Sequence, residues 1–97
     1  MQERGRRFEW DEKKAMLNLL KHGIHFEDAA RTFFDPNFIR LLDPKHSEAE
    51  VRYAGIGQHP MGGVLVTIYT ERGESFRIIS SRRANKKERQ MYEDAKE

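Results

Sequence analysis

The sequence contains no cysteine, which excludes a disulfide framework, thiolate catalysis and a zinc ribbon. It has no run of 18 apolar residues, and residues 1–10 lack the apolar segment of a signal peptide. Its glycines match neither of the phosphate-binding fingerprints. We therefore expect a soluble, cytoplasmic protein that contacts no membrane and needs no cofactor.

Apolar residues are scarce as well, since 37% of the chain is hydrophobic and 35% is charged. A chain of 97 residues forms one domain, 1–97, with a modest core. One Trp, three Tyr and six Phe compensate in part, because each aromatic side chain buries a large area. Residues 1–7 are polar and arginine-rich, so we predict a flexible lead-in there.

The stretch 64–89 organises the rest of the chain. Residues 64–70 are almost wholly apolar or β-branched, which is typical of a strand buried on both faces. A turn over 71–74, with Gly73 at the position that needs a positive φ, leads into a second strand over 75–81. In that second strand, alternation places Arg77, Ile79 and Ser81 on one face.

A short basic helix follows this hairpin. Asn85 and Glu88 have the spacing of a capping box, and the helix should run to about Ala95. Residues 77–89 carry six Lys or Arg against one Glu, so a polyanion is a reasonable partner on electrostatic grounds. The alternative is a basic helix face that is merely solvated.

Two helices are predicted before the hairpin. Asp11 is a good N-cap for a helix to His22, with Gly23 as the residue that ends it. The buried stripe of this helix is predicted to be Met16, Leu17, Leu19 and Leu20. The second helix presents one apolar face, made of Phe26, Ala29, Ala30, Phe33 and Phe34.

The remaining elements are extended. Residues 38–42 and 51–58 are strand candidates, Gly55 and Gly57 indicate a bulge or a close backbone approach, and 8–10 is a possible edge strand. The order predicts an α+β domain: an antiparallel meander of three to four strands, with two N-terminal helices paired on one face and one C-terminal helix.

Candidate sites follow from the polar residues. The histidines His22, His25, His46 and His59 have no spacing that makes them converge on a metal, so we expect none. Ser80 and Ser81 lack the surroundings of a nucleophile elbow. The apolar face of the second helix is either core or a groove for a partner.

Metal-free RNA cleavage is the remaining chemistry. It needs a base for the ribose 2′-OH, cations for the pentavalent phosphorane and an acid for the 5′-oxygen. The cations and possible proton donors stand on adjacent elements: Arg72, Arg77, Arg82, Arg83, Lys86 and Tyr92. His46 or Glu50 could be the base. Simple phosphate binding and a solubilising surface remain open as alternatives.

An ordered series of short motifs over residues 8–92 resembles the BrnT-type toxins. The series is Phe8-Glu9-Trp10-Asp11, Lys14, Asn18, Lys21-His22-Gly23-Ile24, Phe26-Glu27, Ala29, Phe34-Asp35-Pro36, Asp43, His46-Ser47, Glu50, Arg52, Ile56-Gly57, Thr70-Glu71-Arg72, Arg77-Ile78-Ile79-Ser80, Arg82, Ala84, Glu88-Arg89 and Tyr92. The individual motifs are weak, and the series as a whole is specific.

The resemblance implies a RelE-like fold and a ribonuclease toxin of a bacterial type II toxin–antitoxin module. Such a toxin cleaves RNA, with or without the ribosome, and inhibits translation. It is neutralised by a small DNA-binding antitoxin, BrnA, and reaches promoter DNA only through the complex with that antitoxin.

The resemblance also implies site residues. The catalytic set carried over is Arg77, Arg82, Lys86, Glu71 and Tyr92, with the two arginines on the phosphate, Lys86 or Tyr92 as proton donor, and Glu71 as base or as the group that orients an arginine. The RNA-binding set is Arg72, Ser80, Arg83, Lys87, Arg89 and His46. Two residues depart from the family pattern: His25 stands where Ser or Thr is usual, and Arg83 stands where Lys is common.

Two other classes of function stay open at this point. A nucleic-acid-binding module or regulator would need only the phosphate contacts. An interaction protein would use an exposed apolar surface to bind another chain.

Overall fold

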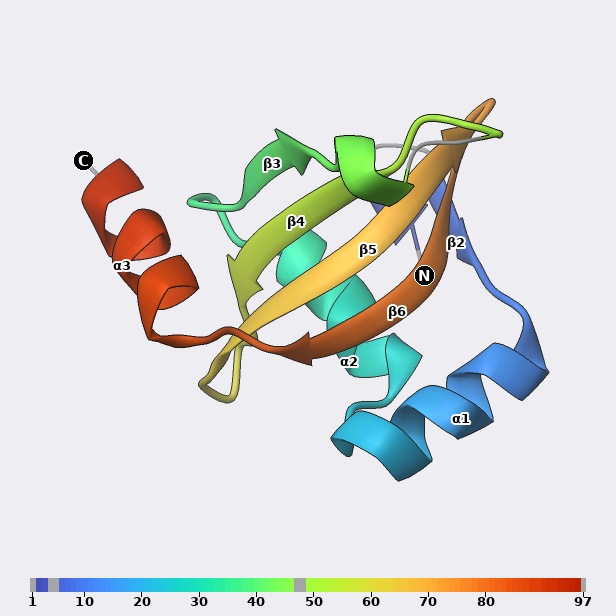
Figure 1. The fold of residues 1–97 in the computed structure, drawn as a ribbon, viewed down its shortest axis with the longest axis horizontal. Helices are drawn as coiled ribbons and strands as arrows, with labels where there is room; N and C mark the ends of the chain where they lie inside the picture. The colour runs from blue at the N-terminus through green and yellow to red at the C-terminus, as the bar shows by residue number, and fades with distance from the viewer. Residues whose placement is uncertain (1, 4–5, 47–48, 97) are drawn as a thin grey trace.

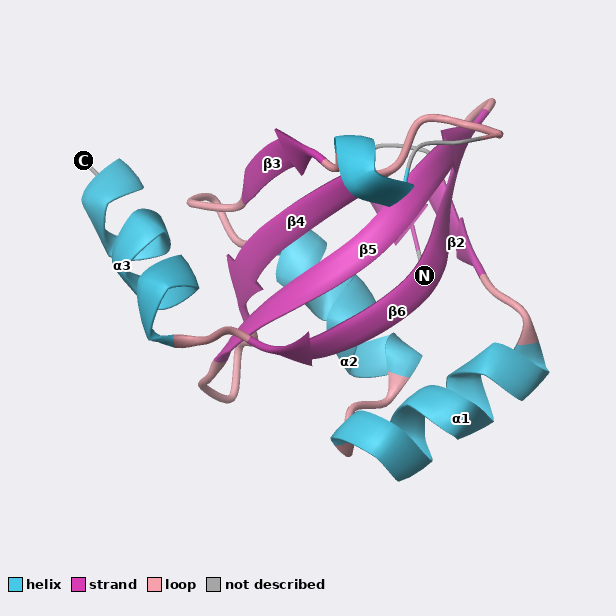
Figure 2. Cartoon of the chain, viewed as in Figure 1, coloured by secondary structure: helices cyan, strands magenta, loops and turns pink. Residues whose placement is uncertain are grey.

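A computed structural model describes residues 2–3, 6–46 and 49–96 of the protein. Figures 1 and 2 show a curved sheet with helices beside and behind it. In chain order, the elements are β1 (Gln2–Glu3), β2 (Arg6–Glu9), α1 (Glu12–His22), α2 (Phe26–Arg31), the 3-10 helix η1 (Thr32–Phe34), β3 (Ile39–Leu42), the 3-10 helix η2 (Pro44–His46), β4 (Tyr53–Gln58), β5 (Val64–Arg72), β6 (Ser75–Arg83) and α3 (Lys86–Ala95).

The sheet has the strand order β1-β2-β6-β5-β4-β3 and is mixed. Strands β3 to β6 form the predicted antiparallel meander, but β2 pairs with β6 in parallel, so the prediction of a purely antiparallel sheet is wrong. The hairpins could be predicted from the turns that join their strands. The pairing of β2 with β6 could not, because its partners are far apart in the chain; Glu9 and Arg77, for example, are 68 residues apart. Within the predicted lead-in 1–7, residues 2–3 and 6–7 lie in strands, and residues 1, 4 and 5 lie outside the described residues.

The predicted helix and turn signals are confirmed. The Asp11 carboxylate caps α1, and Gly23 ends that helix with a φ of 71°. Asn85 and Glu88 form both bonds of the capping box at the start of α3. Gly73 has a φ of 58° in the β5–β6 turn, where residues with a Cβ are disfavoured.

Helix α2 and η1 cover one face of the sheet, which we call the α2 face. Phe26, Ala29 and Ala30 pack on Ile78 of β6, while Phe33 packs among Phe8, Phe38, Tyr69 and Phe76. The predicted apolar face of the second helix is therefore core, except that Phe34 is exposed.

The two N-terminal helices are not paired on one sheet face as predicted. Figure 1 shows α2 behind the sheet and α1 beside β6. The side of α1 that turns inward holds Ala15, Asn18, Leu19 and His22, whereas Met16, Leu17 and Leu20 are 66%, 57% and 78% exposed. The predicted buried stripe is thus wrong for these three residues.

Asn18 is the residue that fixes α1 in this position. Its amide nitrogen donates to the carbonyls of Ile24 and Ser81, at 3.0 and 2.9 Å, and its Oδ1 accepts the Ser81 N–H at 2.9 Å. Strand β2 pairs with β6 only as far as Arg77. Farther along the same side of β6, at Ser81, the Asn18 side chain therefore makes the backbone hydrogen bonds that a neighbouring strand would otherwise make.

Gly55 and Gly57 confirm the predicted close approach. A Cβ on Gly57 would lie 2.7 Å from the Thr32 carbonyl oxygen, and one on Gly55 would lie 2.2 Å from the Phe38 ring. These glycines let η1 and Phe38 pack directly against β4. No helix in the described residues is long and apolar enough to cross a membrane.

Candidate nucleic-acid interface

The predicted cations of β6 depend on a bulge in that strand. Ile68 pairs with Ser80 while Tyr69 pairs with Ile78, so Ile79 has no partner on β5. Ile78 faces α2 before the bulge, and after it Ser81 faces the same way, where its hydroxyl bonds that of Thr67 at 3.0 Å. The prediction that Ser81 shares a face with Arg77 is therefore wrong.

The opposite face, which we call the open face, carries Arg77, Ser80 and Arg82. In Figure 1 the middle of β6 is open on this side, the 3-10 helix η2 lies in front of β4 and β5 toward one end, and α3 lies beside the other end. Arg72, two residues beyond Thr70 on β5, belongs to the same face. The predicted arginines thus share a surface without meeting at one point, since the strand rise puts the Cα atoms of Arg77 and Arg82 roughly 15 Å apart.

Arginines and carboxylates concentrate at the β1–β2 end of the open face. Arg77 donates to Glu9 at 2.8 Å, and Arg72 donates to Glu50 at 3.0 Å. Hydrogen bonding by Arg72 lowers the pKa of the Glu50 carboxyl, and the charges of Arg52 and Arg77 act in the same direction. We call Arg77, Glu9, Arg72 and Glu50 the arginine–glutamate cluster.

Sequence reasoning missed Glu9 in this cluster. The residue faces Arg77 because β2 lies parallel to β6, a pairing that no local pattern indicates. Arg7, which is two residues earlier and exposed, reaches the open face in the same way.

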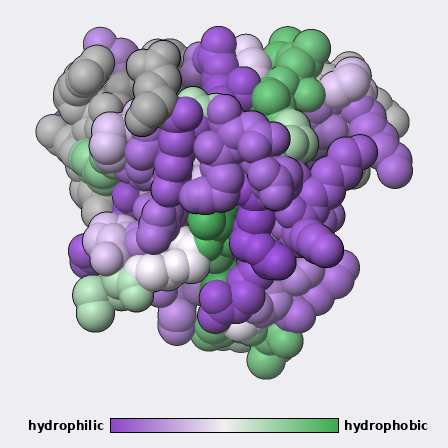
Figure 3. Space-filling view, turned by 90° about the vertical axis from the view of Figure 1, so that its left-hand side faces the viewer, coloured by the Kyte–Doolittle hydropathy of each residue, from purple (hydrophilic) through white to green (hydrophobic). Residues whose placement is uncertain are grey.

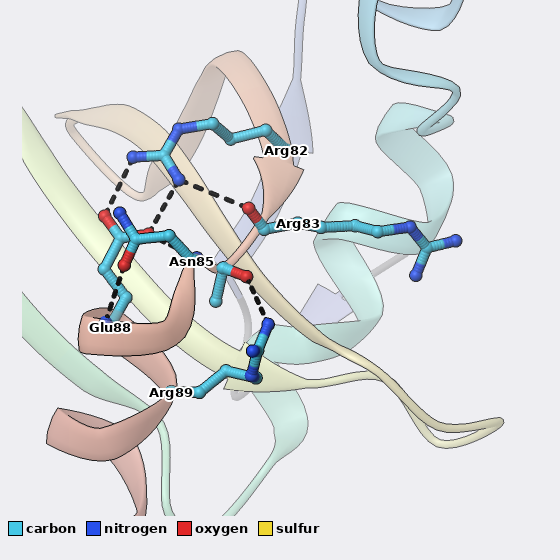
Figure 4. A network of polar contacts seen from close by, with 6 residues as sticks. Arg82, Arg83, Asn85, Glu88 and Arg89 are labelled. Atoms are coloured by element: carbon cyan, nitrogen blue, oxygen red, sulfur yellow. Dashed lines mark hydrogen bonds and ion pairs between the residues drawn. The ribbon is translucent and has the colours of Figure 1, made fainter.

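Arg82 stands at the other end of the face, against the start of α3 (Figure 4). Its two terminal nitrogens donate to the two carboxylate oxygens of Glu88, at 2.7 and 2.8 Å. Glu88 also accepts the Asn85 N–H at 2.9 Å. The Arg82 hydrogen bonds lower the pKa of the Glu88 carboxyl below its ordinary value, so the pair stays ionised at neutral pH.

The other predicted cations separate into two groups. Lys86 and Lys87 open α3 beside Arg82 and are exposed, while Arg89 donates to the Ala84 carbonyl at 2.9 Å. The side of the molecule that carries α3 is mainly hydrophilic (Figure 3). Arg83 points away from Arg82 in Figure 4 and lines a small hollow with Asp28 and His59 on the α2 face. Arg83 therefore does not join the open face.

Glu71 also lies on the wrong face for its predicted role. It pairs in register with Phe76, which packs under η1, and its carboxylate accepts from Arg40 at 3.1 Å. Arg40 in turn lies 4.5 Å above the Tyr53 ring. A base acting on a substrate of Arg77 would have to stand on the other side of the sheet.

Tyr92 is a core residue rather than a surface one. Its ring is 1% exposed and packs with Ile56, Val66 and Ala84, and its hydroxyl donates a short hydrogen bond to Asp35. Burial, followed by the bond to Asp35, raises the pKa of Tyr92 above its ordinary value. A buried hydroxyl that holds its proton this firmly does not fit the predicted proton donor.

His46 has its side chain outside the described part of the structure, so its predicted role stays a prediction. Among the described residues, no three His, Asp or Glu side chains lie close enough together to hold a metal ion.

A family model matches residues 10–88, and its family is described as the ribonuclease toxin BrnT of type II toxin–antitoxin systems. The chain belongs to the BrnT family. Membership confirms the resemblance that the ordered motifs indicated. It accounts for a cationic surface on so small a domain, because a ribonuclease must bind a polyanion.

A solved structure supports the same assignment. The crystal structure of the Brucella abortus ribonuclease toxin BrnT matches with a TM-score of 0.62 and 25% identity, over 84% of this chain and 99% of that one. A comparison with proteins of curated function gave no match. This BrnT chain therefore shares its α+β architecture with a solved member of the family.

Proposed function

We propose that this BrnT chain is an endoribonuclease that binds a single RNA strand along the open face and cleaves it without a metal ion. The observation that carries the proposal is the arrangement of Arg72, Arg77 and Arg82 on one sheet face, with Glu9 in contact with Arg77. A guanidinium group can bind two oxygens of one phosphate at once, and it keeps its positive charge at any physiological pH.

The scissile phosphodiester is proposed to bind at the arginine–glutamate cluster. Glu9, whose side chain is 40% exposed, takes the proton of the ribose 2′-OH. The 2′-oxygen attacks phosphorus, the bond from phosphorus to the 5′-oxygen breaks, and Arg77 stabilises the charge of the phosphorane. Water on the open face protonates the 5′-oxygen, and the hydroxide that forms takes the proton back from Glu9, which leaves a 2′,3′-cyclic phosphate, a 5′-hydroxyl and the regenerated carboxylate.

Arg82, Lys86 and Lys87 are proposed to bind the RNA phosphates next to the scissile one along the strand. They stand too far along β6 and α3 to act on the phosphate that Arg77 holds, so Lys86 positions the strand instead of donating the proton. Ser80 lies on β6 between Arg77 and Arg82, and its hydroxyl is proposed to donate a hydrogen bond to the RNA strand.

Cleavage of messenger RNA in the cytoplasm would inhibit translation and arrest growth, and binding of the antitoxin would relieve both. Family membership supports this role, since the family is described as toxins of type II toxin–antitoxin systems.

The test compares arginines of the two faces. Purified protein is incubated with a defined RNA in the presence of a chelator, and the ends of the fragments are mapped. Arg77→Ala should lower the cleavage rate about 100-fold or more, as loss of a group that stabilises the transition state does. Arg82→Ala should weaken RNA binding and reduce its salt dependence by roughly one counterion.

Arg83→Ala is the matched control, because Arg83 has the same side chain on the other face. Its rate and affinity should equal those of the unmodified protein. Equal losses in the Arg77 and Arg83 variants would refute the site. Tight RNA binding with no fragments at any enzyme concentration would favour the non-catalytic binding module.

A further inference from the structure

Helix α1 turns three large apolar side chains outward, although nothing in the described structure covers them. Met16, Leu17 and Leu20 are 66%, 57% and 78% exposed; Met16 and Leu20 lie on the side of the helix opposite Asn18, and Leu17 lies next to them toward the second groove described below. A single exposed apolar residue is common on a protein surface, but three large apolar side chains close together on an 11-residue helix form a contiguous patch. We call these residues the α1 ridge.

A groove runs along each side of the ridge. The first, of about 240 Å³, lies between α1 and α2, where Ala15, Met16, Leu19 and Phe26 form its apolar lining and Glu12 and Glu27 add two carboxylates. The second, of about 280 Å³, lies between α1 and β6, with Leu17 and Ile79 among its lining residues. A ridge between two grooves matches the way in which apolar anchors of one chain fit the pockets of another.

The charge of the second groove indicates which partner fits there, since the two carboxylates of the first groove do not favour an acidic segment. Lys14, Lys21 and His22 line the second groove, which has no carboxylate among its lining residues, and the exposed Lys13 lies beside the ridge. A partner segment with apolar anchors and neighbouring Asp or Glu residues would complement this surface. A second copy of this chain docked through the same groove would not, because a two-fold contact centred there sets Lys14 and Lys21 of one copy against those of the other.

RNA fits the ridge less well than protein does. Protein surfaces that bind single-stranded nucleic acid use aromatic rings on which bases stack. The ridge has only aliphatic and thioether side chains. Covering methionine and leucine with a ribose-phosphate backbone would leave their apolar area without apolar contacts.

We infer that the α1 ridge and the second groove are the docking surface for an acidic, amphipathic segment of the antitoxin. This inference rests on the proposed function for the identity of the partner. The second groove is lined by Ile79 and Ser80 of β6, so a segment docked there lies next to the open face. Antitoxin binding would thereby place acidic side chains beside the surface that is proposed to bind RNA.

The experiment uses the full chain and the antitoxin polypeptide encoded in the same module, with affinity measured by titration calorimetry. The double variant Leu17→Ser, Leu20→Ser should weaken antitoxin binding about 30-fold or more, as expected when central anchors are removed. Both side chains are mostly exposed, so the variant should keep its fold and its unfolding midpoint.

Leu42→Ser is the matched control, because Leu42 is 61% exposed on β3, at the opposite edge of the sheet. It should leave antitoxin affinity unchanged. Lys14→Gln with Lys21→Gln should weaken binding at low salt and less at high salt, whereas Lys87→Gln should not.

Several results would overturn the inference. One is unchanged antitoxin affinity in the ridge variant, and another is an equal loss in the Leu42 variant. A third is a toxin that sediments as a dimer when unmodified and as a monomer with the ridge variant, since the second copy would then be the occupant. A fourth is a ridge variant that loses RNA binding and keeps antitoxin binding.

RNA cleavage by the free proteins separates this inference from the proposed function. The ridge variant should cleave RNA as fast as the unmodified chain. If neither protein cleaves RNA, the ribonuclease proposal fails, and the antitoxin titrations still decide the docking surface.

Discussion

Arg77 and Arg82 project from the same face of β6, although they are five positions apart, because Ile79 has no partner on β5. In a regular strand, residues five apart face opposite sides, and Arg82 would then point into the layer of α2. The bulge therefore builds the open face. Bulges of this kind are frequent next to functional sites, where they redirect a side chain.

The pair Ser80 and Ser81 tests this face assignment. Ser81→Ala should lower the free energy of unfolding by about 1–2 kcal/mol, because it leaves the buried Thr67 hydroxyl without its partner. Ser80→Ala, on the open face, should change it by less than about 0.5 kcal/mol. Urea denaturation of both variants gives the comparison, and the reverse order would mean that the faces are exchanged.

Asn18 offers a second prediction about stability. Asn18→Ala removes three hydrogen bonds and leaves the Ser81 N–H and two carbonyls without partners in a buried place. We expect a loss of about 2–4 kcal/mol in the free energy of unfolding. Asn18→Asp should cost at least as much, since a carboxylate would face the carbonyls of Ile24 and Ser81.

Lys14→Ala, one turn earlier on α1 and exposed, serves as the control and should be nearly neutral. Losses below about 0.5 kcal/mol for both Asn18 variants would show that α1 is not held by this side chain.

Local signals predicted the parts of the fold that depend on neighbouring residues. The caps at Asp11, Gly23 and Asn85 and the turn at Gly73 are confirmed because each is decided within a few residues of sequence. The β4–β5–β6 meander follows from the turns that join its strands.

The face of α1 could not be predicted in this way. Its apolar residues fit one helical stripe as well as another, and the choice depends on a bond between Asn18 and Ser81, 63 residues apart. A polar residue at the centre of the buried side runs against the hydrophobic pattern. The pattern therefore assigned Met16, Leu17 and Leu20 to the core.

The candidate site was predicted in part for the same reason. The composition of 77–89 located the cations, but alternation without the bulge gave Arg77 the wrong neighbours. Glu9 entered the site only through the parallel pairing of β2 with β6, which joins the two ends of the chain.

The ion pair of Glu88 predicts a dependence of stability on pH. Arg82 lowers the pKa of the Glu88 carboxyl in the folded protein below its ordinary value of 4.5. The unfolded chain thus binds a proton first as the pH falls, so this stabilisation is complete above the ordinary pKa and disappears at lower pH. Glu88→Gln should therefore be less stable than the unmodified protein at pH 7.

The difference between these two proteins should shrink as the pH falls below 4.5 and through the lowered pKa. Unfolding free energies measured from pH 7 to pH 3 give the curve. A constant difference between Glu88→Gln and the unmodified protein would contradict the ion pair as its cause.

The Tyr92→Phe variant tests whether the Tyr92 hydroxyl acts in the core or in catalysis. Tyr92→Phe keeps the ring among Ile56, Val66 and Ala84 and removes only the hydroxyl that bonds to Asp35. Asp35 still accepts the N–H groups of Asn37 and Gln58, so the expected loss in unfolding free energy is about 1–2 kcal/mol.

RNA cleavage by this variant, measured at a temperature where it is fully folded, should stay within about twofold of the unmodified rate, because the hydroxyl cannot reach a substrate on the open face. A proton donor would behave differently, since its removal typically costs 10²- to 10⁴-fold in rate. A stable Tyr92→Phe protein with a rate reduced to that extent would return Tyr92 to the active site. It would also require the end of the sheet beneath α3 to open during the reaction.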